Sequence, residues 1–130
     1  MLNSRQLESI GKTCFLLIFF VSGINKFFNF SATQEYMSSY SIPFASLLLV
    51  FVIIIEVAAP ICILFNKYRK IATLSLILFL VPTTLIFHGF WGFEGAERFV
   101  QRIQFMKNLS IFGALILFYL TLPKKEKLWG

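Results

Sequence analysis

The chain has 130 residues, of which 58% are hydrophobic and 14% are charged, and its mean hydropathy is +0.79. Soluble globular domains carry about 25% charged residues, so this composition argues against a water-soluble fold. The formal net charge of +6 does not indicate nucleic-acid binding, because the basic residues are scattered among separate loops rather than gathered along one stripe.

Four apolar segments are each long enough to cross a bilayer as a helix, which takes about 20 residues. They cover approximately residues 13–31, 44–65, 70–89 and 104–122. The connections between them are short, so the sequence predicts a single all-α domain over residues 1–130, a transmembrane four-helix bundle. Arg5 and Lys12, before the first apolar segment, resemble the start of a secretory signal, but three further spans favour an uncleaved first helix.

The two longer connections have the composition of segments that lie at a membrane surface. After the first span, Ser31 and Gln34 have the spacing of a capping box, which predicts a short interfacial helix. Before the fourth span, residues 87–105 alternate aromatic residues with glycine and charge, which predicts an aromatic interfacial loop with Trp91 at headgroup depth. An alternative is that Trp91 and its neighbouring phenylalanines line the entrance of a ligand site.

The basic residues between the spans predict the orientation of the chain, because positive charge favours the cytoplasmic side of a membrane protein. Eight basic residues lie on the side of the two termini: Arg5, Lys12, Lys67, Arg69, Lys70, Lys124, Lys125 and Lys127. Four lie on the other side: Lys26, Arg98, Arg102 and Lys107. We therefore expect both termini in the cytoplasm.

An acidic residue near the middle of the bilayer is the strongest functional signal in the sequence. Glu56 lies in the second span, where insertion of an acid costs roughly 2.5 to 3.5 kcal/mol, so we expect it to be protonated or paired. Lys26 is the candidate partner, because two long side chains can bridge their difference in depth. Such a pair would act as a clamp that fixes helix register, or as a ligand or proton site. The third alternative is that the two residues make no contact.

Polar residues recur at three- and four-residue steps in the first, third and fourth spans, so each of these helices has one polar face. Such faces turn towards the bundle, because lipid leaves polar groups unsatisfied. We expect a polar cavity in the half of the bilayer away from the termini, where the ligand would bind. Its predicted residues are Lys26, Glu56, His88, Trp91, Lys107 and Asn108, with Ser22, Asn25, Thr84 and Gln104 as secondary members.

Several of these residues have a simpler explanation that stays open at this point. His88 is equally consistent with an interfacial residue whose ring is hydrogen-bonded. Lys107 fits a side chain that extends to the headgroups, and Asn108 fits an interhelical hydrogen bond. One histidine without clustered carboxylates does not support a metal site.

Four segments, in this order along the chain, resemble the DoxX family of small membrane proteins. They read FFVSGINKFF, IIIEVAAP, RKIATLSLILFLVPTTLIFHGFW and QFMKNLSIFGAL. The resemblance covers nearly the whole chain and implies a four-helix fold in the bacterial inner membrane. The recurring positions of the family correspond to Lys26, Glu56, His88, Trp91, Lys107 and Asn108. The chain departs from the family at Phe112, Gly113 and Ala114, where a double glycine is usual, and at Asn66, where glycine is usual.

Three functions are compatible with these observations. The first is an accessory or assembly protein that binds a small ligand, a lipid or a protein partner in the polar cavity. The resemblance implies the second, a quinone-binding subunit of a redox complex linked to thiosulfate or oxidative stress, in which Glu56 exchanges a proton. The third is a small proton-coupled transporter, which would have to form a homo-oligomer. The chain has no haem, flavin or iron–sulfur motif, so a redox partner would supply the electrons, and enzymatic activity stays open.

Overall fold

The computed structural model describes residues 1–130 and contains helices but no strands. The helices are α1 (Ser4–Phe28), α2 (Phe30–Ser39), α3 (Ala45–Leu64), α4 (Arg69–Phe87), the 3-10 turn η1 (Phe90–Gly92) and α5 (Gly95–Thr121). Four segments are long and apolar enough to cross a membrane, namely α1, α3, α4 with its extension through η1, and α5. The predicted all-α architecture with four spans is therefore confirmed.

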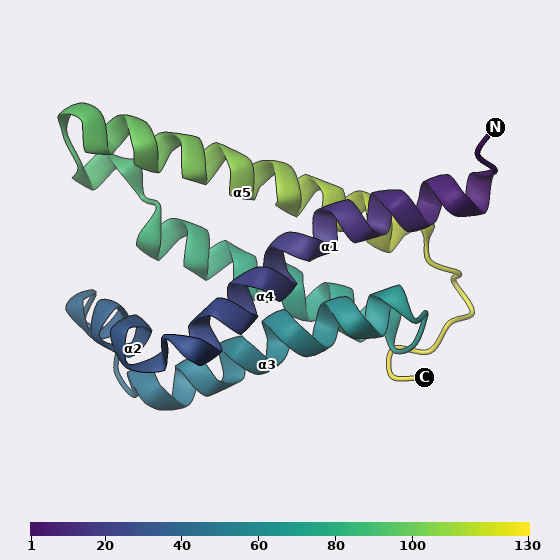
Figure 1. Ribbon diagram of the computed structural model, residues 1–130, viewed down its shortest axis with the longest axis horizontal. Coiled ribbons are helices and arrows are strands. Elements are labelled where there is room, and N and C mark those ends of the chain that lie inside the picture. Colours follow the sequence, from purple (N-terminus) through teal and green to yellow (C-terminus); the bar gives the residue numbers. More distant parts are fainter.

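The two ends of the bundle carry different elements (Figure 1). Both termini and the turn between α3 and α4 lie at one end, which we call the terminal side. The short helix α2 and the connection between α4 and α5 lie at the opposite end, which we call the loop side. All polar groups of the predicted cavity belong to the loop-side half or to the middle of the spans.

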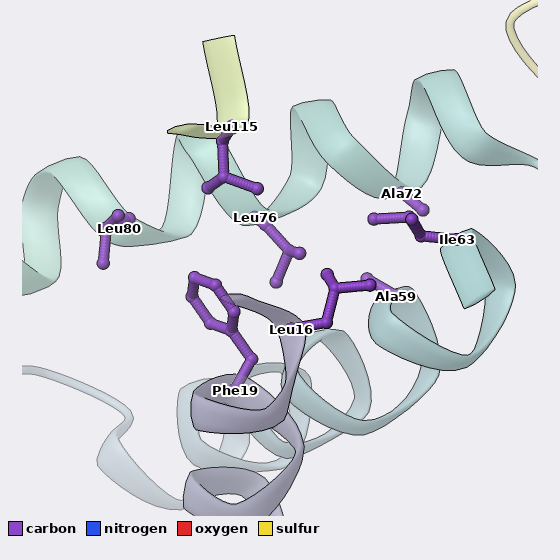
Figure 2. Packing of buried hydrophobic residues seen from close by; sticks show 8 residues of the cluster. All are labelled: Leu16, Phe19, Ala59, Ile63, Ala72, Leu76, Leu80 and Leu115. Atoms are coloured by element: carbon purple, nitrogen blue, oxygen red, sulfur yellow. The ribbon is translucent and has the colours of Figure 1, made fainter. Parts of the chain in front are cut away.

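The four long helices meet in one apolar core. Its eight buried residues are Leu16, Phe19, Ala59, Ile63, Ala72, Leu76, Leu80 and Leu115, which converge in Figure 2. Helix α5 contributes only Leu115 to this core, and it lies along one edge of the molecule beside α4 (Figure 1). Most of the surface of α5 is therefore free of contacts with the rest of the chain.

A smaller apolar cluster fixes α2 to the loop-side end of the bundle. Met37 of α2 is buried with Ala45 and Leu49 of α3. Beside this cluster, the ring of Tyr36 stacks on the ring of Phe87 at the end of α4, with centroids 5.5 Å apart. The predicted interfacial helix is thus present, and it packs onto the bundle rather than lying free on the membrane.

The ends of the first two helices differ from those predicted. Helix α1 begins at Ser4 rather than near residue 13, because Asn3 and Gln6 form a reciprocal capping box with two hydrogen bonds of 2.9 Å. The capping box predicted from Ser31 and Gln34 is wrong. Helix α2 begins at Phe30, after Asn29, and has no side-chain cap.

The predicted aromatic loop before the fourth span is shorter than expected. Helix α5 begins at Gly95 rather than near residue 104, so the connection from α4 is reduced to residues 88–94 with η1 inside it. The acidic residue Glu97 in the first turn stabilises this helix start, because it interacts favourably with the positive end of the helix dipole. Polar residues between Gly95 and the lipid-embedded part of α5 are therefore helical.

Candidate functional site

Lys26 and Glu56 form the predicted contact between α1 and α3. The ammonium nitrogen of Lys26 lies 2.8 Å from Oε2 of Glu56. The ammonium group of Lys26 donates a hydrogen bond to the hydroxyl of Ser22, one turn earlier on α1. Oε2 of Glu56 accepts no hydrogen bond, because the ammonium group is close to it but not oriented for one. The interaction of lysine with glutamate is therefore mainly Coulombic, which is strong where water is excluded.

A glycine makes this contact possible. Gly23 is buried in α1, and a β-carbon at this position would lie 2.9 Å from Cβ of Glu56 and 2.9 Å from a methyl group of Val57. Only a glycine lets the two backbones approach so closely. Because Lys26 follows Gly23 by three residues, it lies on the same face of α1 and reaches the carboxylate.

A cavity of about 200 Å³ lies at the loop-side end of this contact. Its polar lining consists of Lys26, Thr33, Tyr36, Thr83 and His88, and side chains of α2, α3 and α4 complete its apolar wall. The side chain of Lys26 is 23% exposed, whereas that of Glu56 is 4% exposed and is not part of the lining. The cavity surface therefore presents the positive partner of the pair and hides the negative one.

The expected single cavity with Lys107 and Asn108 is not formed, because α5 is set apart from α1 and α3. Lys107 is exposed and lines a different hollow on the outer surface of α5. Asn108 turns towards α4, where its amide donates a hydrogen bond of 3.0 Å to the hydroxyl of Thr84. Thr84 is buried and in turn donates to the carbonyl of Leu80, so this group is an interhelical link rather than part of the cavity.

His88 caps the end of α4 and lies between the cavity and α5. Its Nδ1 is 2.9 Å from the side-chain oxygen of Gln101, which fixes the orientation of the ring. Gln101 was not among the predicted residues. Counting back seven residues from Asn108 along a helix gives the same face and would have identified it, but the segment was expected to be a loop.

Three further predicted residues lie outside the cavity. Trp91 is 60% exposed and packs on the rings of Phe90 and Phe105. Asn25 and Gln104 are exposed, and the carbonyl and side-chain oxygens of Asn25 accept hydrogen bonds from Asn29. These side chains therefore do not meet the Lys26 and Glu56 pair.

A second polar network, which the sequence did not reveal, lies on the terminal side. Lys12 is buried, pairs with Glu8 at 3.1 Å and donates a hydrogen bond to the side chain of Asn66. Arg69 makes two hydrogen bonds, of 2.8 and 3.2 Å, with the carboxylate of Glu126. These contacts attach α1 and the C-terminal tail to the turn between α3 and α4.

The hydroxyl of Tyr36 is held in its neutral form at the edge of the cavity. Partial burial, a contact of 3.3 Å with the hydroxyl of Tyr40 and the negative charge of Glu97 together raise the pKa of Tyr36 to about 12, with burial the largest cause. A neutral tyrosine offers both a donor and an acceptor. This edge of the cavity therefore carries no negative charge at physiological pH.

The chemistry of the cavity favours a ligand that accepts hydrogen bonds. The hydroxyl hydrogens of Thr33 and Thr83 are used by main-chain carbonyls within their own helices. The Nδ1–H of His88 donates to the side-chain oxygen of Gln101, which leaves Nε2 of a neutral imidazole as an acceptor. Lys26 is then the strongest remaining donor in the lining. A carbonyl, carboxylate or phosphate oxygen would find a charged donor there.

Comparison with known proteins agrees with this architecture. The DoxX family model matches residues 9–89. The inner membrane protein YphA of Escherichia coli (strain K12) is 31% identical over 114 residues, which are 88% of this chain and 81% of YphA. The inner membrane protein YqjF of the same organism is 29% identical over 123 residues, which are 92% of this chain and 89% of YqjF. No solved structure gives a significant match.

The family match includes most of α1 and all of α2, α3 and α4. It therefore contains both residues of the buried ion pair and the complete polar lining of the cavity. The two relatives extend the similarity over most of the chain, and four apolar helices agree with their membrane location. The chain is thus a multi-pass inner membrane protein, and it belongs to the DoxX family.

Proposed function

We propose that the protein is a noncatalytic binding or assembly protein that holds a small ligand in the loop-side cavity. The observation that carries this proposal is the arrangement of the ion pair, in which Lys26 faces the cavity and Glu56 is buried behind it. A ligand oxygen that replaces part of the lysine's interaction with Ser22 would gain a charge-assisted hydrogen bond. The ammonium group of Lys26 in the lining indicates a ligand whose headgroup accepts hydrogen bonds, such as a lipid headgroup.

A quinone is the second candidate ligand, and the aromatic rings at the cavity favour it. Tyr36 and Phe87 both line the cavity, and their stacked rings offer a flat apolar surface near the ammonium group of Lys26. A quinone has a flat ring with carbonyl oxygens, which matches this combination. In that case the protein would act as a quinone-binding subunit, and a partner enzyme would supply the electrons.

Proton-coupled transport is the third candidate, with Glu56 as the proton site. A single four-helix unit would have to associate with other copies to alternate access to the two sides. A proton flux in liposomes that depends on Glu56 would support this function over the other two.

The ligand can be identified directly. Protein purified in mild detergent is extracted with organic solvent, and the extract is analysed by mass spectrometry. We expect a stoichiometric small molecule in the parent and its loss in Lys26→Met. The matched control is Asn25→Leu, which changes an exposed neighbour on α1 outside the cavity and should retain the ligand.

Because Lys26→Met leaves Glu56 unpaired, a second variant guards against misfolding. The double substitution Lys26→Met with Glu56→Leu replaces the pair by apolar side chains, which is often neutral or stabilising in a protein interior. Retention of the ligand by this folded double variant would contradict the proposal. A quinone in the parent extract would assign the redox function instead.

We further propose that the terminal side faces the cytoplasm, as the distribution of basic residues predicts. In a background without Cys14 and Cys62, single cysteines at Ser38 in α2 and at Lys67 in the α3–α4 turn lie on opposite sides of the bundle. A membrane-impermeant thiol reagent applied from the periplasm should label position 38 and not position 67. The reverse pattern would invert the orientation.

A further inference from the structure

We propose that α5 carries a second binding site, on the face turned away from the other helices, for the headgroup of an anionic phospholipid. Helix α5 has 27 residues, yet only Leu115 is buried. Its outward face bears two basic side chains, Arg102 in the first third of the helix on the loop side and Lys107 near its middle. This site is separate from the loop-side cavity, with which it shares no lining residue.

The outward face of α5 is hollowed at these two residues. The hollow has a volume of about 400 Å³, and its apolar floor is formed by Phe90 of η1 together with Phe99, Ile103 and Met106 of α5. Arg102 and Lys107 are its charged members, and none of its lining residues is acidic. An apolar floor with basic residues at its edge matches a phospholipid, which has acyl chains next to a phosphate.

Arg102 and Lys107 form no ion pair with an acidic residue of the chain. The three ion pairs of the protein involve Lys12, Lys26 and Arg69, each with an acidic partner. Arg102 instead lies over the ring of Phe99 at 5.7 Å, a cation-π contact that holds the guanidinium beside the hollow and leaves its hydrogen-bond donors free. Two uncompensated cations in one hollow favour an anionic group.

The depth of the two residues suits a headgroup. Arg102 lies on the loop side of α5, and Lys107 follows it by five residues, about 7.5 Å along a helix axis, near the middle of the helix. The long side chain of Lys107 can extend back towards Arg102. Long basic side chains at such positions extend towards the membrane surface. A phosphate between the two would accept hydrogen bonds from both, and an acyl chain would follow Met106 and Ser110 towards the middle of the bilayer.

A second copy of the chain fits this face less well. If two α5 helices packed in parallel on their outward faces, Arg102 of one copy would lie near Lys107 of the other, because these positions flank the contact line on opposite sides. Like charges at such positions repel. The charge pattern therefore favours an anionic lipid over self-association.

The test uses the full-length protein, stripped of lipid in detergent and titrated with phosphatidylglycerol or phosphatidylcholine in native mass spectrometry. We expect the parent to prefer phosphatidylglycerol. The variant Arg102→Gln with Lys107→Gln should bind phosphatidylglycerol more weakly, by about fivefold for each removed charge. The charge-keeping variant Arg102→Lys with Lys107→Arg should bind like the parent.

A control of equal net charge separates a site from general attraction. Arg98→Gln with Lys125→Gln removes two exposed cations outside the hollow and should leave the preference unchanged. An equal loss in this control, or no loss in the Arg102 and Lys107 variant, would overturn the proposal. A parent dimer that Ser110→Leu disrupts, with phosphatidylglycerol affinity unaltered, would assign the face to a second copy.

Discussion

Gly23 of α1 and Glu56 of α3 approach so closely that a β-carbon on the glycine would lie 2.9 Å from the β-carbon of the glutamate. This approach places Lys26, three residues along the same helix face, 2.8 Å from the carboxylate. The close contact of the two backbones and the buried ion pair are therefore parts of one structural unit. Each can be disturbed separately.

Gly23→Ala should destabilise the protein. Alanine favours a helix over glycine by about 1 kcal/mol, but inserting a methyl group into a filled interface costs typically 1 to 3 kcal/mol. We expect a lower melting temperature in detergent. Gly113→Ala is the control, because nothing lies within 4 Å of its added β-carbon, and it should leave stability unchanged or raise it. Equal melting of both variants would contradict the close approach.

Glu56→Ala should lower stability more than Glu56→Gln. Removal of one partner of a buried pair costs about 3 to 5 kcal/mol, and we expect the lower end because Lys26 keeps 23% exposure. Glutamine retains an oxygen that can accept a hydrogen bond from the lysine, so its cost should be smaller. Thermal melts followed by circular dichroism measure both. If the two variants melt like the parent, the pair does not hold α1 and α3 together.

The hydrogen bond between Asn108 and Thr84 should couple α5 to α4. Interhelical hydrogen bonds in membrane proteins contribute on average about 0.6 kcal/mol in double-mutant cycles. The cycle of Asn108→Ala and Thr84→Val should show a coupling energy of that size. Ser110→Ala is the control partner, because the Ser110 hydroxyl bonds only to the carbonyl of Met106 in its own helix. A coupling of Thr84 with Ser110 as large as that with Asn108 would refute a specific link.

Alkaline pH should weaken the packing of α2 through Tyr36. Its pKa is raised from 10.0 in the unfolded chain to about 12 in the folded protein. Between these two values, the folded protein keeps this tyrosine neutral, whereas the unfolded chain ionises it. The resulting stabilisation is complete below pH 10 and is lost as the pH rises towards 12. We expect thermal stability to fall over this range in the parent and less steeply in Tyr36→Phe. Parallel pH profiles of the two proteins would exclude the effect.

The four spans and the ion pair could be predicted from the sequence because the bilayer leaves few choices. A segment of about 20 apolar residues must span, and an acid inside it must find a partner. Lys26 was the basic residue within an apolar span that could reach Glu56. The helix ends were harder to predict, since Asn3 and Gly95 start their helices in polar segments where hydropathy carries no signal.

The rotation of α5 about its axis determines which polar residues of this helix face α4 and which face outward. Lys107 and Asn108 are adjacent, and successive residues of a helix point about 100° apart, so at most one of them can face α4 directly. Leu115 is packed against the core, and Asn108 precedes it by seven residues on the same face, which turns Asn108 inward and Lys107 outward. The sequence alone determined which residues are polar within the membrane. Only the packing of Leu115 determined which of them meet, because the direction of each side chain depends on the rotation of the whole helix about its axis.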